Sequence, residues 1–164
     1  MIEEYIVLCS TIGFSMFLFF MWQRLMARKK QKALALQEEQ QAFLEQNKSK
    51  EGVVTTRSGL QYQIIEEGDG KNYPSPTSRV KAHYHGTLVD GTVLDSSVDR
   101  GKPAFFGLNE VIPGLMEALQ LMSVGAKAQL CIPSELCYSE RSIGKIPSNS
   151  TLIFEVELLS IEEE

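Results

Sequence analysis

The sequence contains few of the residues on which metal binding and nucleophilic catalysis depend. Among its 164 residues are two histidines and three cysteines, and the cysteines show no metal-binding spacing. No nucleophile and base are paired in a recognisable pattern. Gly68-Asp69-Gly70 is too short for a phosphate-binding loop, because the helix start that such a loop needs is missing. We therefore expect no cofactor, no metal, and a reaction that needs little covalent chemistry.

The scarce histidines and cysteines leave two alternatives open. His83 and His85 are two positions apart and share one strand face, where they could contribute to a metal site or have a structural or surface role. No cysteine, aspartate or glutamate ligand is evident nearby, which favours the second role. Cys131 and Cys137 could form a disulfide, but free buried thiols are the favoured interpretation.

The sequence also lacks an excess of basic residues. Its formal net charge is −5, and acidic residues outnumber basic ones from Lys50 onward. Neutralising the phosphates of a nucleic acid requires a basic face, so we expect no nucleic-acid partner. With 43% hydrophobic residues, the chain has room for one packed domain and an appendage.

Charge is absent from one long segment near the N-terminus. The residues from Tyr5 to Trp22 are all uncharged, and as a helix they would extend about 27 Å, just enough to cross a bilayer. The alternatives are a buried core helix and a cleaved signal peptide. A core helix would precede a polar stalk with nothing to pack on, and a signal peptide usually has positive charge before its apolar run. The segment therefore predicts a transmembrane anchor, residues 1–22.

The charges around this segment predict an orientation. Two glutamates, Glu3 and Glu4, precede it. Basic residues follow it closely: Arg24, Arg28, Lys29, Lys30 and Lys32. Basic residues near a span tend to stay on the cytoplasmic side, so we expect a single-pass membrane protein with its domain in the cytoplasm. A periplasmic domain is the alternative.

Residues 23–50 predict a helical stalk or linker. From Gln23 to about Lys48 the sequence is rich in Gln, Glu, Lys, Ala and Leu and contains no Gly or Pro, which favours a continuous helix. One heptad seam has four apolar members and two polar interruptions: Met26, Lys29, Ala33, Leu36, Gln40 and Phe43. The seam favours a coiled-coil homodimer only weakly, and a solvated stalk is the alternative.

Residues 51–164 show short strand patterns separated by turns. Leu60 to Ile65 is a short strand candidate, and Val80 to Thr87 alternates so that Tyr84 faces away from both histidines. Asp90-Gly91 is a strong hairpin turn. The last strand is expected over residues 151–160, with Leu152, Phe154, Val156 and Leu158 on one face.

A helical period interrupts the strand patterns once. Leu115, Ala118, Leu119 and Met122 have the spacing of one helix face, with Pro113 near the start and Gly125 after the end. Many strands and one short amphipathic helix predict an α+β fold, in which a curved antiparallel sheet wraps around that helix.

Five motifs occur in a fixed order between Val80 and Leu159. They read VKAHYHGTLVDGTVLDSS, DRGKPAFF, EVIPGLMEALQLMSVGAK, IPSELCY and IPSNSTLIFEVELL. Their order resembles the FKBP family of peptidyl-prolyl cis-trans isomerases, in particular the bacterial Mip-like branch with an N-terminal extension. The resemblance covers roughly residues 58–161. It implies the same fold, prolyl isomerase activity and assistance to the folding of proline-containing proteins near the membrane.

The resemblance also implies the roles of individual residues. Asp95, Tyr138 and Ile112 would be catalytic: Asp95 would pair with Arg100 and face the twisting amide, Tyr138 would offer its hydroxyl, and Ile112 its backbone N–H. The substrate-binding residues would be Tyr84, Leu94, Arg100, Phe106, Val111, Leu115, Ile146 and Phe154. The expected partners are proline-containing polypeptides and a macrolide inhibitor.

Some residues depart from the family pattern. Leu94 and Ala104 stand where aromatic residues are frequent, and Leu115 replaces the tryptophan that commonly forms the floor of the pocket. Ser139 replaces a glycine after Tyr138. An FKBP-like chaperone or binding module of low activity, which holds proline-containing chains, is therefore the alternative function.

Overall fold

The computed structural model describes the backbone of residues 2–162 and the side chains from Met16 onward within that range. The chain divides into two compact units, Met1–Leu36 and Gln37–Glu164. Helix α1 (Ile2–Lys48) is continuous, which confirms the helix expected from Gln23 to Lys48. Apart from Gly13, the sequence of α1 contains no Gly or Pro that would interrupt a helix. The predicted division into residues 1–22, 23–50 and 51–164 stays a prediction.

The predicted membrane localisation is wrong. Among the residues that the structure describes, no helix is both long and apolar enough to cross a bilayer. Of the predicted anchor, the structure describes the side chains of residues 16–22. The side chains of Tyr5 to Ser15, on which the rest of the predicted anchor depends, lie outside the described ones.

The second unit contains all the strands that the structure describes. They are β1 (Val54–Thr55), β2 (Gln61–Glu66), β3 (Arg79–Leu88), β4 (Val93–Ser96), β5 (Ala104–Gly107), β6 (Lys127–Ile132) and β7 (Leu152–Glu162). Besides the end of α1, the helical segments of this unit are α2 (Pro113–Gln120) and two single turns, η1 (Leu108–Glu110) and η2 (Ser134–Leu136). The expected strands, hairpin turn and short helix are all present, with small shifts at their ends.

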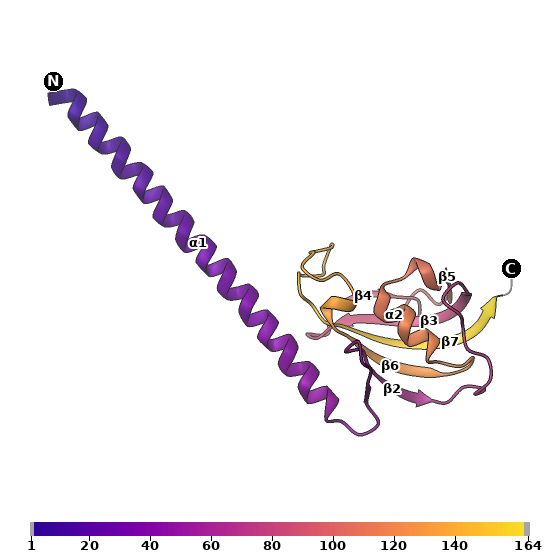
Figure 1. Ribbon diagram of the computed structural model, residues 1–164. Helices are drawn as coiled ribbons and strands as arrows, with labels where there is room; N and C mark the ends of the chain where they lie inside the picture. Colours follow the sequence, from indigo (N-terminus) through magenta and orange to yellow (C-terminus); the bar gives the residue numbers. More distant parts are fainter. Residues whose placement is uncertain (1, 163–164) are drawn as a thin grey trace. The chain divides into compact units, whose positions relative to one another are not determined.

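The strands form one antiparallel sheet in the order β1-β2-β6-β7-β3-β4, and β5 also pairs with β3. The long strands β3 and β7 lie side by side at its centre, and Tyr84 is opposite Val156 in their register (Figure 1). This arrangement confirms the α+β class with an antiparallel sheet. The strand order brings residues of β3, β4, β5 and β7 to one end of the same sheet face.

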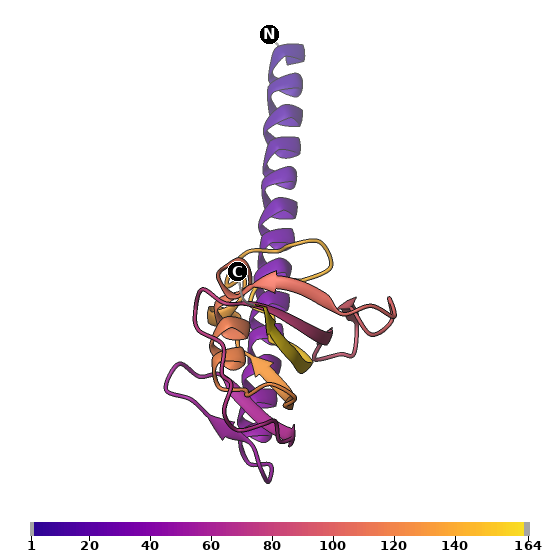
Figure 2. The ribbon, with the colours of Figure 1, turned by 90° about the vertical axis from the view of Figure 1, so that its right-hand side faces the viewer.

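Helix α2 packs on one face of the sheet and closes the core (Figure 2). Its helical spacing buries Leu115, Ala118 and Leu119 against sheet residues such as Val156 and Leu158. Pro113 is its first residue, and the backbone N–H of Ile112, the N-cap, precedes the helical hydrogen bonds. The N-terminus of α2 therefore lies at the edge of the core, and the two residues before it, Val111 and Ile112, are extended.

The end of α1 belongs to the same unit as the sheet. The side chain of Asn47 donates to the amide oxygen of Gln61 at 2.9 Å, and the amide nitrogen of Gln61 donates to the carbonyl of Leu44 at 2.9 Å. Asn47 and Gln61 are both buried. Because buried amide groups need partners, these hydrogen bonds fix the last turns of α1 on strand β2.

Candidate active site

A cavity of about 610 Å³ opens at one end of the sheet, beside the N-terminus of α2. It is lined by residues from β3, β4, β5, α2, β7 and the loops between them: Tyr84, Leu94, Asp95, Phe106, Glu110, Val111, Ile112, Leu115, Tyr138, Ile146, Leu152 and Phe154. The structure thus brings together every predicted site residue except Arg100 around this one cavity. Ala104, one of the departures from the family pattern, is not among the described residues that line it.

Aromatic rings form the walls of the cavity. The ring centroid of Tyr84 lies 6.4 Å from that of Phe106 in an edge-to-face arrangement and 6.3 Å from that of Phe154. Phe154 packs over Gly86 of β3, where an added Cβ would come within 2.5 Å of the ring. Glycine is therefore needed at position 86, because any other residue would push Phe154 out of the wall.

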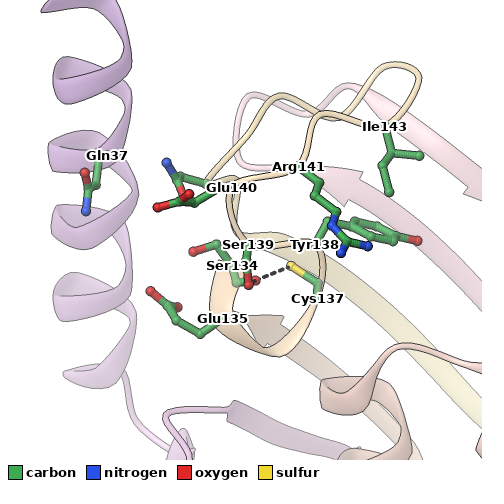
Figure 3. Close-up of a pocket in the computed structure, with 10 residues that line it drawn as sticks. Gln37, Ser134, Glu135, Cys137, Tyr138, Ser139, Glu140, Arg141 and Ile143 are labelled. Atoms are coloured by element: carbon green, nitrogen blue, oxygen red, sulfur yellow. Dashed lines mark hydrogen bonds between the residues drawn. The ribbon is translucent and has the colours of Figure 1, made fainter. Parts of the chain in front are cut away.

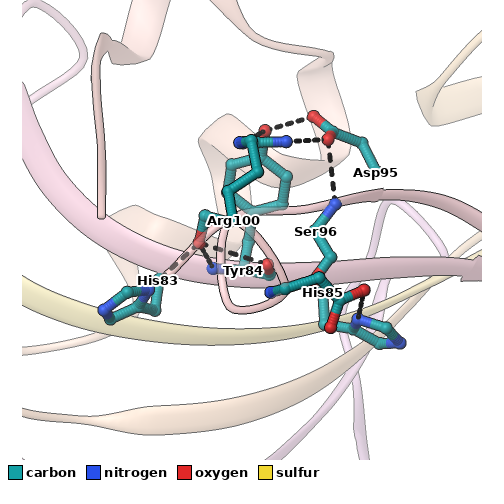
Figure 4. A network of polar contacts seen from close by, with 8 residues as sticks. His83, Tyr84, His85, Asp95, Ser96 and Arg100 are labelled. Atoms are coloured by element: carbon teal, nitrogen blue, oxygen red, sulfur yellow. Dashed lines mark hydrogen bonds and ion pairs between the residues drawn. The ribbon is translucent and has the colours of Figure 1, made fainter. Parts of the chain in front are cut away.

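A polar network joins two of the lining residues, Tyr84 and Asp95, to Arg100 (Figure 4). The hydroxyl of Tyr84 donates to Asp95 Oδ2, and Arg100 Nη1 donates to Asp95 Oδ1. Arg100 Nη2 also donates to the Tyr84 hydroxyl at 3.0 Å, and the guanidinium group lies over the Tyr84 ring, 5.7 Å from its centroid. Arg100 thus contacts two lining residues although it is not itself among the described lining residues.

The network favours the ionised form of Asp95. The hydrogen bond from Tyr84 and, after it, the hydrogen bond and charge of Arg100 lower the pKa of Asp95 below its ordinary value. Partial burial and the adjacent carboxylate raise the pKa of Tyr84, whose hydroxyl stays protonated as the donor. Asp95 is therefore a carboxylate with its oxygens already engaged, and it supplies negative charge at the rim rather than a mobile proton.

Another part of the cavity is formed by the approach to α2. Val111 and Ile112 are extended, and the helix begins directly after them at Pro113. Leu115 of α2 is 7% exposed and forms an apolar floor. The N–H of Ile112 lies at the start of this helix beside an apolar surface, a position that suits a ligand carbonyl.

Tyr138 comes from the loop between η2 and β7 (Figure 3). On either side of it, Cys137 and Ser139 are bonded to the carbonyl of Ser134: the Cys137 thiol donates at 3.4 Å and the Ser139 N–H at 2.8 Å. Ser139 has a φ of 50°, which glycine adopts without strain, so this departure from the family pattern keeps the glycine-type backbone. A second cavity, of about 1010 Å³, is lined by residues of this loop and by Gln37 of α1.

Two lining residues were not predicted. Glu110 lies at the rim, where its carboxylate accepts from Gly107 N–H at 2.9 Å and is 3.7 Å from Arg79 Nη1. Leu152 lies on β7, two residues before Phe154 and on the same strand face. The alternation of β7 was a sufficient signal for Leu152, whereas nothing in the sequence marks the side chain of Glu110.

The histidines lie outside this site. They line another cavity with Lys127, Glu155 and Glu157, on the face of β3 opposite to Tyr84, as predicted. His83 Nδ1 is 3.1 Å from Ser97 Oγ, and His85 Nδ1 is 4.0 Å from Asp99 Oδ2. Within the described part of the chain, no group of three histidine, cysteine or acidic residues has the geometry of a metal site.

Cys131 and Cys137 are free thiols, as the favoured interpretation predicted. Burial raises the pKa of Cys131 to about 11, so its thiol stays protonated at neutral pH. Burial also raises the pKa of Cys137. Neither thiol has the character of a nucleophile.

Comparisons with known proteins agree with this geometry. Residues 70–159 match the family described as FKBP-type peptidyl-prolyl cis-trans isomerase, and residues 14–64 match the domain amino terminal to such isomerases. The chain therefore belongs to the FKBP-type peptidyl-prolyl cis-trans isomerases. The predicted family and enzyme class are confirmed.

Individual relatives support the assignment. The chain is 54% identical over 140 residues to the FKBP-type 22 kDa peptidyl-prolyl cis-trans isomerase of Escherichia coli. The matched region covers 85% of this chain and 68% of that protein. It is 51% identical to FkpA of Aeromonas hydrophila, over 84% of this chain and 51% of that protein. It is 49% identical to the outer membrane protein MIP of Legionella longbeachae, over 74% of this chain and 52% of that protein. The chain thus spans about half to two thirds of the length of these relatives.

Solved structures show the same fold. The crystal structure of FkpA from Escherichia coli matches with a TM-score of 0.78 and 38% identity, over 84% of this chain and 64% of that one. A peptidyl-prolyl isomerase from Pseudomonas syringae matches with a TM-score of 0.72 and 34% identity, over 79% of this chain and 95% of that one.

Proposed function

We propose that the cavity of about 610 Å³ is the prolyl site, and that Asp95, Tyr138 and Ile112 act there on the X-Pro amide. The observation that supports this proposal is the convergence of an aromatic wall, an engaged carboxylate and a backbone donor on one apolar cavity. The aromatic rings of Tyr84, Phe106 and Phe154 hold the proline ring. Leu94, Val111, Leu115 and Ile146 supply the remaining apolar surface.

The chemistry requires rotation of a bond and no group transfer. Resonance makes the X-Pro amide planar and gives a rotational barrier of about 18–20 kcal/mol. In the twisted amide the resonance is lost, so an apolar surface that excludes water favours the twisted form over the polar planar one. The Ile112 N–H and the Tyr138 hydroxyl fix the carbonyl groups of the substrate, and the negative charge of Asp95 faces the twisting amide.

The full chain should accelerate cis-to-trans exchange in a proline tetrapeptide. Asp95→Ala and Tyr138→Phe should each lower kcat/KM by about tenfold, because each removes one polar group from the transition state. Both variants should remain folded in circular dichroism. A folded wild-type protein that gives only the uncatalysed rate would contradict the proposal.

The alternative function, a binding module of low activity, has one supporting observation. Leu94 and Leu115, which replace aromatic residues of the family pattern, both line the cavity. Leu94→Phe discriminates between the two functions in the tetrapeptide assay. A large gain in kcat/KM would support the binding module, and an unchanged value would support the isomerase. Proline-containing polypeptides are the proposed substrates in both cases, and a macrolide that fills the same cavity is the proposed inhibitor.

A further inference from the structure

The side chain of Gln40, on α1, reaches a segment that borders the prolyl site. Its amide oxygen accepts a hydrogen bond from the backbone N–H of Thr151 at 2.9 Å, across 111 positions of sequence. Gln40 is 8% exposed and Thr151 is 1% exposed, so solvent cannot readily replace either partner. A long polar side chain is rarely buried unless it satisfies another buried group, so this contact is a specific feature of the fold.

Thr151 belongs to the segment 149–152, which is bonded to the loop that carries Tyr138. The N–H of Asn149 donates to the carbonyl of Ser139 at 2.7 Å, and the thiol of Cys137 contacts the carbonyl of Ser150 at 3.5 Å. Both sequence neighbours of Tyr138 are therefore tied to this segment. Leu152, at its other end, lines the cavity directly.

We propose that Gln40 is a positioning residue for the prolyl site. By holding the N–H of Thr151, it fixes segment 149–152 and thereby places Leu152 and Tyr138 around the substrate. This inference rests on the proposed function of the cavity. It adds to the site a residue of α1, a helix from which no described residue lines the cavity. Without the acceptor, the buried N–H of Thr151 has to move toward water, and the segment moves with it.

The test compares two substitutions in the full chain. Gln40→Met keeps the length of the side chain and removes the acceptor, and Gln41→Met makes the same change at an exposed neighbour. Gln40→Met should raise KM for the proline tetrapeptide about three- to tenfold, because displaced lining residues bind the substrate less well. Gln41→Met should leave KM unchanged.

The KM value separates positioning from a purely structural role. If the substitution only lowered the folded fraction, kcat per total protein would fall, while the remaining native molecules would keep the native KM. Gln40→Glu supplies the rescue, since a carboxyl group keeps an acceptor oxygen at the same place. It should return KM to within about twofold of the wild-type value. A native KM in Gln40→Met, or an equal rise in Gln41→Met, overturns the proposal.

A second measurement does not depend on catalysis. The NMR signals of the Leu152 methyl groups and the Tyr138 ring should shift in Gln40→Met and remain in place in Gln41→Met. Unshifted signals in Gln40→Met overturn the proposal even if the wild type proves inactive, whereas an inactive wild type with shifted signals contradicts only the proposed function. If Gln40→Met does not fold, Gln40→Asn, which withdraws the acceptor by one methylene, takes its place with the same expected results.

Discussion

Asp95 has three polar neighbours, and all of them favour its ionised form. The Tyr84 hydroxyl, the Arg100 guanidinium and the Ser96 N–H each donate to it. The carboxylate and the guanidinium are about half exposed, so solvent screens the ion pair and the hydrogen bonds matter more than the charge attraction. At the residue scale, Asp95 is therefore a fixed acceptor whose orientation depends on Tyr84.

Tyr84→Phe should change the pH dependence of activity and stability. The variant lacks the largest cause of the lowered Asp95 pKa, so this pKa should rise toward its ordinary value and the acid limb of the kcat/KM profile should move to higher pH. Because the folded-state pKa of Asp95 is depressed, its contribution to stability is present above about pH 4 and is lost as the pH falls through the folded value. The part of the stability difference that Asp95 causes should therefore vanish in acid. An acid limb at the wild-type position would contradict this assignment.

Ser139→Gly should stabilise the protein. Ser139 has a φ of 50°, and the left-handed conformation costs a residue with a Cβ about 1–2 kcal/mol. Glycine relieves this strain but adds entropy to the unfolded chain, worth up to about 1 kcal/mol, so a net gain of about 0.5 kcal/mol is expected in urea unfolding. Ser139→Ala keeps the Cβ and serves as the control, with no gain. A gain of equal size in both variants would show that φ is not the cause.

At the scale of elements, α1 and the sheet form one structure near Lys48. Gln61 of β2 is 4% exposed and is bonded on one side to Asn47 and on the other to the carbonyl of Leu44. Asn47 also lies 3.3 Å from Cys131 Sγ of β6. The end of the helix is thus joined to two neighbouring strands by side chains that are shielded from water.

Asn47→Leu should destabilise the protein by about 1–3 kcal/mol, because it leaves the buried amide oxygen of Gln61 without a donor. Urea unfolding of the full chain measures the loss. Gln46→Leu places the same residue at an exposed neighbouring position of the same helix and should change stability by less than about 0.5 kcal/mol. Equal stabilities of the two variants would mean that α1 ends without a structural role in the sheet.

The periodic elements could be predicted from the sequence, and the contacts between distant elements could not. The alternation in β7 and the helical spacing of Leu115, Ala118 and Leu119 are local patterns produced by one buried face. Gln40 shows the opposite case: in the sequence it only interrupts a heptad seam, and in the structure it is bonded to Thr151. Hydrogen bonds between residues so far apart follow no period, so the sequence gives no signal for them.

The candidate site was predicted in part for the same reason. Most lining residues could be named because the family resemblance assigns them, whereas composition alone would place Tyr84, Phe106 and Phe154 in an ordinary core. Glu110 was missed because its role depends on where η1 directs its side chain. The membrane anchor was wrong, because among the described residues no helix is both long and apolar enough to cross a bilayer.

At the scale of the whole molecule, stability should be highest at the centre of the sheet. Strand β7 is paired along its length with β3 on one side and over residues 152–157 with β6 on the other. Strand β3 pairs with β4 and β5 as well as β7. Strand β1 has only two residues, both exposed, and one neighbour, β2. A strand bonded on both sides opens only when both neighbours separate, which requires loss of the core.

Native-state hydrogen exchange should therefore rank the strands. Amides in the paired parts of β3 and β7 should exchange only through global unfolding, with the free energy measured by urea, while those of β1 should exchange with a free energy near zero. Val156 of β7 and Thr55 of β1 give a matched comparison of two β-branched residues in the same sheet. Equal protection at these two positions would show that the sheet unfolds as a single unit. The expected gradient would instead place the cavity, which is built on β3 and β7, over the most stable part of the protein, where its geometry is held most firmly.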